Sequence, residues 1–430
     1  MIKELSDPFA VDGDGPVWPK IRGFLGRQKR RIFPQLGKNS TPRPVFGFTE
    51  GATGALTKKA LLIYLTQAFY EGPERFRATG FYPPLQSVEI ARAFNRLGYA
   101  VDVVDYRDDA FVPDVHYDVC LGMHYNFGRL LPILAERKTR TIYYGTGAYW
   151  EFENSAEAGR SENLRNRRGI DLKLPERLTA NNWVQTADAV IAMGNEFTTS
   201  MYRSHNKQVF KIDHVALLHD PPNLDRKDFG AAARRNFLCV SSVGLLHKGL
   251  DLVLEAFTQL KDFHLWVCGP LQAEGERDFI RAYRRELFHT PNIHPVGWIR
   301  NTSSEFTELS EKCVAAIHAS CAEGMPGTVL NNMARGLVPL VSRESSIDTD
   351  GLGVLLEDCT VTGIRRTVTD FANMSPEICQ RMAKEAYRAA CTRYTMESYT
   401  QNIERILKTI SNSPEPTQER AEECYSRNAL

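Results

Sequence analysis

The sequence predicts an α/β protein with two doubly wound, Rossmann-like domains that face each other across a cleft. Strand-like and helix-like segments alternate from residue 59 onward, which is typical of βαβ units with a parallel sheet. The alternation lapses at residues 219–236, where prolines and dense charge predict a linker, and then resumes. The length of 430 residues fits more than one domain. Open parallel sheets bind ligands at the carboxyl ends of their strands, so the cleft is the expected site.

The first domain is expected over residues 59–218, after an irregular segment at 1–58 that lacks sustained periodicity. Apolar runs predict its strands, and apolar residues at helical spacing before Gly98 predict a helix. The strands are expected at 59–69, 99–106, 117–124, 139–145 and 187–194, and the helix at 85–97.

The second domain is expected over residues 237–394, and its alternation is clearer. Strands are expected at 237–244, 264–270, 293–299, 314–320 and 338–342, and helices at 248–260, 274–287, 303–312 and 328–335. A helical pattern from 376 to 410 closes the fold, and residues 395–411 are expected to cross back to the first domain. Residues 412–430 are rich in Ser, Pro and Glu and predict a disordered tail.

Composition excludes several classes of protein. Fifty-three basic against 52 acidic side chains give no global field that would hold nucleic acid. The apolar runs are far shorter than the ~20 residues of a membrane span, and the N-terminus lacks a secretory pattern. Nine cysteines without a Cys-x-x-Cys pair predict reduced thiols in a cytoplasmic protein and no zinc site.

One segment of the N-terminal region is strongly basic. Residues 20–38 hold seven Lys and Arg and no acid, with apolar residues between them. A solvated arm is the simpler interpretation. The alternative is peripheral contact with an anionic membrane surface, such as the inner face of a cell membrane.

Several common motifs are absent from the sequence. There is no Gly-x-Gly-x-x-Gly after a strand, no Walker loop and no Gly-x-Ser-x-Gly elbow. Asp348 and Asp350 form a lone Asp-x-Asp before Gly351, and a solvated turn is the better interpretation than a metal site. We therefore expect no metal and no dinucleotide.

The first informative segment spans residues 241–257. A strand ends at Gly244, a short loop carries His247 and Lys248, and an amphipathic helix follows. Glycine lets backbone approach a ligand closely, and a lysine here could place its charge on a diphosphate. The alternative is a surface lysine in the first turn of a helix, where the helix dipole mildly disfavours it.

The second segment spans residues 319–336, where a buried strand runs through a glycine-containing loop into a helix. Glu323 and Gly324 lie in the loop, and Glu323 could accept hydrogen bonds from sugar hydroxyls. The helix start at Gly327, Thr328 and Val329 is expected to expose unpaired N–H groups, which favour an anion. The alternative is that Glu323 only caps the helix.

Together these residues resemble the C-terminal half of the retaining GT-B glycosyltransferases of glycosyltransferase family 4, the group 1 glycosyl transferases. The matching residues are Lys248-Gly249, Glu323-Gly324, Met333, Gly336 and Pro339, and Val296-Gly297-Trp298 resembles the family's base-binding loop. The resemblance covers roughly residues 237–345, and the first domain only in outline.

The resemblance implies transfer of a hexose-like sugar, with retention, from a nucleotide diphosphate donor to a glycan or lipid-linked acceptor in cell-surface polysaccharide synthesis. It implies no cofactor besides that co-substrate, and no metal. Lys248, His247 and the helix start would stabilise the leaving diphosphate. Glu323 would orient the sugar, and Asn331 would hold the ribose.

Two departures from the family pattern leave an alternative open. The family's second Glu falls at Asn331, and its usual Arg after the strand glycine is Leu245. The alternative is a catalytically impaired GT-B protein that binds a nucleotide sugar or glycan as a scaffold or regulator.

The first domain carries fewer matches. The family's diglycine loop is represented by Gly80 alone. His124 ends a predicted strand and resembles the family's acceptor-side histidine, although a structural histidine is the alternative. Thr146 and Tyr149 follow another strand and are expected to line the acceptor side with an aromatic face.

Overall fold

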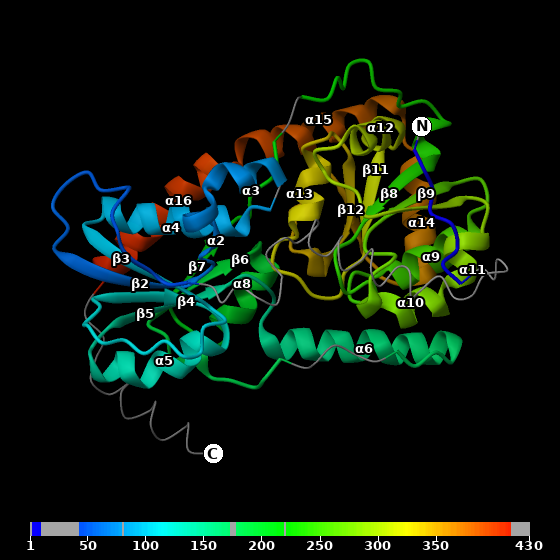
Figure 1. Ribbon diagram of the computed structural model, residues 1–430. Coiled ribbons are helices and arrows are strands. Elements are labelled where there is room, and N and C mark those ends of the chain that lie inside the picture. The colour runs from blue at the N-terminus through cyan, green and yellow to red at the C-terminus, as the bar shows by residue number, and fades with distance from the viewer. Residues whose placement is uncertain (1, 10–42, 80, 173–177, 219–220, 414–430) are drawn as a thin grey trace. The chain divides into compact units, whose positions relative to one another are not determined.

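A computed structural model describes residues 2–9, 43–79, 81–172, 178–218 and 221–413 (Figure 1). Its internal contacts form two compact units. So far as they are described, residues 2–9, 150–178 and 216–395 make the C-terminal unit, and 43–149, 179–215 and 396–413 make the N-terminal unit. The basic segment at 20–38 and nearly all of the expected tail lie outside the described residues.

The C-terminal unit is built on a parallel sheet of six strands. In spatial order they are β10 (Ile293–Gly297), β9 (His264–Cys268), β8 (Asn236–Val240), β11 (Ala315–His318), β12 (Val338–Ser342) and β13 (Val354–Leu356). The strands are mostly apolar because helices cover both faces of a parallel sheet. The strand order reverses between β8 and β11, and such a reversal opens a crevice at the carboxyl ends of the two strands.

Apart from α6, which precedes all of its strands, the helices of this unit lie between its strands or after the last one. They are α6 (Trp150–Arg168), α9 (Leu250–Gln259), α10 (Arg277–Ala282), α11 (Arg284–His289), α12 (Ser304–Lys312), α13 (Gly327–Met333), α14 (Val361–Ala372) and α15 (Pro376–Thr392). Ser303, Thr360 and Ser375 cap the starts of α12, α14 and α15 by accepting a backbone N–H with their hydroxyl oxygens. Predicted helix 274–287 is instead a 3-10 turn followed by α10 and α11.

Helix α6 belongs to the C-terminal unit, although the predicted first domain ran through it (Figure 1). Leu164 is fully buried in the core of this unit. Arg160 and Arg167 both pair with Asp251 of α9, at 3.5 and 2.8 Å. These contacts are long-range in sequence, so local pattern could not place the helix.

The N-terminal unit holds a second sheet, of seven strands. In spatial order they are β1 (Val45–Phe48), β3 (Tyr99–Asp105), β2 (Lys58–Tyr64), β4 (Val119–Gly122), β5 (Arg140–Gly145), β6 (Ala189–Met193) and β7 (Val209–Ile212). Only β1 pairs antiparallel. The helices are α2 (Gln67–Glu71), α3 (Pro73–Thr79), α4 (Pro83–Arg96), α5 (His124–Glu136), α7 (Trp183–Thr186), α8 (Glu196–Arg203) and α16 (Met396–Ser411).

The single helix predicted at 376–410 is wrong, because the chain breaks it between α15 and α16. The backbone carbonyl of Tyr394, at the break, accepts the N–H of Ala216 at 2.7 Å. Helix α16 then packs on α4 of the N-terminal unit, where Arg96 and Glu404 form an ion pair at 2.6 Å. Predicted strand 59–69 is also too long, since β2 ends at Tyr64 and α2 begins at Gln67. Within the described residues, no helix combines the length and apolarity needed to cross a membrane.

Candidate active site

Two loops of the C-terminal unit meet at the reversal of strand order. One follows β8 and carries His247 and Lys248, and the other follows β11 and carries Glu323. The N–H of Cys321 donates to the carbonyl of His247 at 3.0 Å, which joins the loops. Gly249 has φ +77°, and a Cβ on it would stand 2.1 Å from the carbonyl oxygen of Ala319. The Lys-Gly pair therefore has a physical reason: only glycine lets the first loop lie this close to the second.

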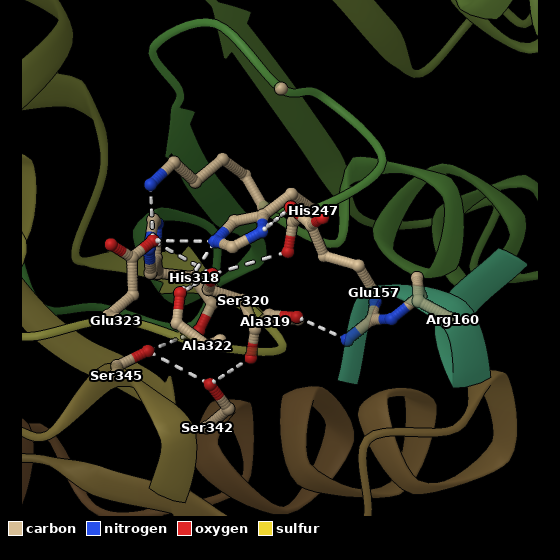
Figure 2. Close-up of polar contacts among 12 residues, drawn as sticks. Glu157, Arg160, His247, His318, Ala319, Ser320, Ala322, Glu323, Ser342 and Ser345 are labelled. Carbon is tan, nitrogen blue, oxygen red and sulfur yellow. Dashed lines mark hydrogen bonds and ion pairs between the residues drawn. The ribbon is translucent and has the colours of Figure 1, made fainter. Parts of the chain in front are cut away.

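The contact between the two loops is an ion pair between Lys248 and Glu323 (Figure 2). The Lys248 Nζ donates to Glu323 Oε1, and the Ser320 hydroxyl donates to the same oxygen at 2.8 Å. The side chains of Lys248 and Glu323 are only 14% and 12% exposed. The sequence-predicted pair is thus brought together in a mostly buried setting.

Two histidines lie beside the Glu323 carboxylate. His318 Nε2 is 3.5 Å and His247 Nε2 is 3.8 Å from Glu323 Oε1. Burial alone would raise the pKa of Glu323, but Lys248, His318 and His247 together lower it below the ordinary range. Glu323 is therefore ionised at neutral pH.

His247 is held between two hydrogen-bond acceptors. Its Nδ1 lies 2.8 Å from Glu157 Oε1, and its Nε2 lies 2.5 Å from the carbonyl oxygen of Ala322. An ionised carboxylate and a carbonyl only accept, so both ring nitrogens carry hydrogen and the ring is an imidazolium. Burial would lower the pKa of His247, but its contacts with Cys321 and Glu157 and the charge of Glu323 raise it to about 10.

Helix α6 supplies the outer part of this cluster. Arg160 donates from Nη2 to the Ala319 carbonyl at 2.9 Å (Figure 2). Gly249 approaches the same carbonyl. Burial raises the pKa of Glu153; His247 opposes this, and Glu157 and Glu323 add to it. Sequence reasoning missed Glu153, Glu157 and Arg160. Glu153 and Glu157 are four residues apart on a helix, and a helix face exposed to solvent carries the same spacing of acids. The sequence therefore held no signal that could have distinguished a site from a solvated face.

Gly244 lies in the loop after β8 and has φ +86°. Its N–H donates to Glu276 Oε1 at 2.5 Å, and the N–H of Leu245 donates to Glu276 Oε2 at 3.3 Å. The backbone at this position therefore binds a carboxylate of the chain itself. The Leu245 side chain is fully buried in the core, away from the charged cluster.

The start of α13 differs from the expectation of three unpaired N–H groups. The helix begins at Gly327, but the N–H of Val329 donates to the Pro326 carbonyl at 3.0 Å and is not available to a ligand. Thr328 lies in the same first turn, and Gly324 is buried in the preceding loop. Asn331 is 8% exposed, and its Oδ1 accepts the N–H of Leu217 at 2.7 Å.

The predicted base-binding loop lies at the end of β10. Gly297 has φ +82°, and a Cβ there would be 2.6 Å from Cδ1 of Leu5. The N–H of Leu5 donates to the Pro295 carbonyl at 2.7 Å, so the N-terminal segment packs along this edge strand. Trp298 is 38% exposed.

The remaining predicted residues belong to the N-terminal unit. His124 begins α5 with φ +59° and is exposed. Thr146 is half-buried after β5. The Tyr149 ring was expected on an open face but is 4% exposed, because it stacks on His205 at 4.2 Å and packs edge-on against Tyr202.

No cluster of three or more His, Cys, Asp or Glu suited to a metal occurs among the residues that the structure describes. The metal independence expected from the sequence stays a prediction.

Comparison with known proteins bears on both units. Residues 223–389 match the model of the family "Glycosyl transferases group 1". No curated protein matches the chain. Among solved structures, a glycosyltransferase from Rickettsia africae is 12% identical, with 83% of this chain and 100% of that one covered and a TM-score of 0.53. Sucrose-phosphate synthase from Thermosynechococcus elongatus is 13% identical, with 82% of this chain and 98% of that one covered and a TM-score of 0.51.

These likenesses confirm the predicted fold class, two Rossmann-like domains as in GT-B glycosyltransferases. The family match includes both loops of the charged cluster.

Proposed function

We propose that this chain is a glycosyltransferase that moves a sugar from a nucleoside diphosphate donor to an acceptor hydroxyl, with retention at the anomeric carbon. The observation that carries the proposal is the Lys248–Glu323 pair. It lies after β8 and β11, where the strand order reverses, within the region that matches group 1 glycosyl transferases. This is the point at which doubly wound sheets bind ligands.

Lys248 would stabilise the leaving group. The bond between the anomeric carbon and the diphosphate oxygen breaks, and its electron pair goes to the diphosphate. An ammonium group has three N–H donors, so the bond to Glu323 leaves two for phosphate oxygens. The imidazolium of His247 adds positive charge nearby without giving up its bonds to Glu157 and Ala322. Preorganised charge of this kind is usually the largest catalytic contribution.

Glu323 would orient the sugar. Its ionised carboxylate can accept hydrogen bonds from sugar hydroxyls while Lys248 and Ser320 hold it in place. The acceptor oxygen bonds to the anomeric carbon on the face that the diphosphate leaves, and the hydroxyl proton passes to the departing phosphate oxygen. In this scheme Lys248 and His247 supply the charge that a metal would otherwise supply.

The alternative is a catalytically impaired protein, and it draws on Leu245 and Asn331. Leu245 packs in the core and Asn331 binds the backbone of Leu217, so each residue has a structural task. The contacts described for them do not involve the Lys248–Glu323 pair. We therefore place the transferase first. By resemblance, we propose a cytoplasmic enzyme acting on a glycan or lipid-linked acceptor in polysaccharide synthesis.

A thermal-shift panel with UDP, GDP, ADP and their sugar conjugates would identify the donor, and a transfer assay would follow. Glu323→Gln and Lys248→Ala should each lower kcat/KM by orders of magnitude in folded protein. Glu311→Gln, at an exposed position of the same unit, is the matched control. Stabilisation by a nucleotide sugar without any transfer would favour the impaired alternative, and full activity in Glu323→Gln would refute the proposed site.

A further inference from the structure

A pocket of about 550 Å³ opens at the amino ends of strands in the C-terminal sheet, opposite the candidate active site at their carboxyl ends. It lies where β8, β9 and β10 begin, and its side chains include Arg235, Asp262, His264, Trp266, His294 and Lys312. The volume is within the range of small-molecule sites. The candidate active site is at the carboxyl ends of the strands, about 15 Å away for strands of this length. The pocket is therefore separate from it.

One wall of the pocket is a rigid stack of rings. Trp266 and His294 stack with centroids 4.1 Å apart and planes at 17°, and His264 follows His294 at 5.2 Å and 25°. The Lys312 ammonium lies 4.0 Å from the centre of the Trp266 ring. Trp266 is 6% exposed, so the stack is anchored in the core of the unit.

Hydrogen bonds along this wall decide where a proton can be taken up. Glu4 Oε1 lies 2.9 Å from His294 Nδ1, and His294 Nε2 lies 3.0 Å from His264 Nδ1. A carboxylate accepts, so His294 donates from Nδ1 and, when neutral, accepts at Nε2 from His264. This leaves Nε2 of His264 as the nitrogen that gains a proton and becomes a donor.

The balance of charge favours an anion. The pocket lining holds two permanent cations, Arg235 and Lys312, and one carboxylate, Asp262. Glu4 is not part of the lining and is bound to His294. Burial and the neighbouring His294 and Lys312 lower the pKa of His264. An anion bound in the pocket would attract a proton on His264 and so raise the pKa of this imidazole.

We propose that this pocket binds the phosphate group of a small molecule, with Arg235, Lys312 and protonated His264 as its donors. The planar guanidinium of an arginine matches two phosphate oxygens, and a lysine adds a point charge. Inorganic phosphate and a phosphate monoester share this chemistry. The site is separate from the donor site of the proposed transferase and does not depend on it.

The test is calorimetric titration of the full chain with inorganic phosphate and with glycerol 3-phosphate, at pH 6.0 and 8.0 and low ionic strength. The phosphate itself also gains a proton over this range, so the His264 contribution is measured against His264→Gln. We expect the ratio of affinities at pH 6.0 and 8.0 to be higher in the unaltered chain than in His264→Gln. Arg235→Gln and Lys312→Gln should each weaken binding at least tenfold. Lys261→Gln, at an exposed lysine one residue before Asp262, should leave binding unchanged. Tighter binding of the monoester would point to an organic phosphate as the ligand, and tighter binding of inorganic phosphate would point to the free ion.

Two further measurements can overturn the proposal. The imidazole NMR signal of His264, assigned with His264→Gln, should titrate at higher pH when phosphate is present. Phosphate binding should also survive in folded Lys248→Ala, checked by circular dichroism, since Lys248 does not line the pocket. Absence of binding, binding that ignores Arg235→Gln and Lys312→Gln, or binding lost in Lys248→Ala would each refute the pocket, and none of them would bear on sugar transfer.

Discussion

The ammonium group of Lys248 donates a hydrogen bond to the carboxylate of Glu323, although 75 residues separate the two in the chain. The bond joins the loops after β8 and β11, neighbouring strands whose order reverses at this point. Because both side chains are mostly buried, each depends on the other for its charge balance.

The pair should show strong coupling in stability. Lys248→Met removes the ammonium group from a mostly buried carboxylate, which keeps its bond to Ser320, and should cost about 3–5 kcal/mol of unfolding free energy. The double variant Lys248→Met/Glu323→Leu removes both charges. Its loss of unfolding free energy should be smaller than the sum of the losses in the two single variants. Urea denaturation of all four proteins measures the coupling. Additive free energies would show that the two groups act independently.

Substitution of Gly249 should separate the two loops. A Cβ would stand 2.1 Å from the Ala319 carbonyl oxygen, and φ is +77°, so Gly249→Ala is both crowded and strained. Gly244→Ala has φ +86° but only a 3.5 Å contact, and should cost about 1–2 kcal/mol. The melting temperature of Gly249→Ala should be well below that of Gly244→Ala. Gly275→Ala is the control, because a Cβ at Gly275 would meet no atom within 4 Å. Equal melting temperatures for the first two would mean that crowding is unimportant.

The charge on His247 predicts a pH dependence. Its folded pKa of about 10 exceeds the unfolded value near 6.5, so its contribution to stability is complete below pH 6.5 and is lost as pH rises through 10. Glu157→Gln keeps an oxygen that can accept from His247 Nδ1 but removes the negative charge, and should therefore lower this pKa. The difference in unfolding free energy between the two proteins should therefore shrink from pH 6.5 to pH 10.

Nitrogen NMR of the His247 ring provides a direct check. Both ring nitrogens should be protonated at pH 8 in the unaltered chain and should titrate at lower pH in Glu157→Gln. Glu162→Gln, at an exposed position on the same helix, is the matched control. A neutral ring at pH 8 in the unaltered chain would contradict the assignment.

The packing of α6 on α9 should depend on the ion pairs that Asp251 forms. This carboxylate is fully buried and pairs with Arg160 and Arg167, so Asp251→Ala leaves the buried Arg160 without that partner and should cost about 3–5 kcal/mol. Hydrogen exchange of the α6 amides should accelerate. Asp171→Ala, which breaks an exposed ion pair with Arg165, should leave both the exchange rates and the free energy of unfolding nearly unchanged. Unchanged exchange in Asp251→Ala would mean that other contacts hold the helix.

Much of the fold could be predicted from local pattern. The strand at Val338–Ser342 falls where the apolar run predicted it, since a strand buried on both faces is a short continuous apolar run. The break after α15 could not be predicted. The pattern runs through Tyr394, and only its long-range bond to Ala216 marks the turn there.

The sequence by itself determined the alternation of strands and helices, the two loops and their chemistry, because periodicity and glycine act over a few residues. Lys248, Gly249 and Glu323 could be singled out for that reason. Only the tertiary structure decided that β8 and β11 are neighbours, that α6 brings Glu157 to His247, and that Tyr149 is buried. Each of these depends on contacts between segments far apart in the chain, and the free energy of such contacts comes from burial and charge pairing that no short pattern encodes.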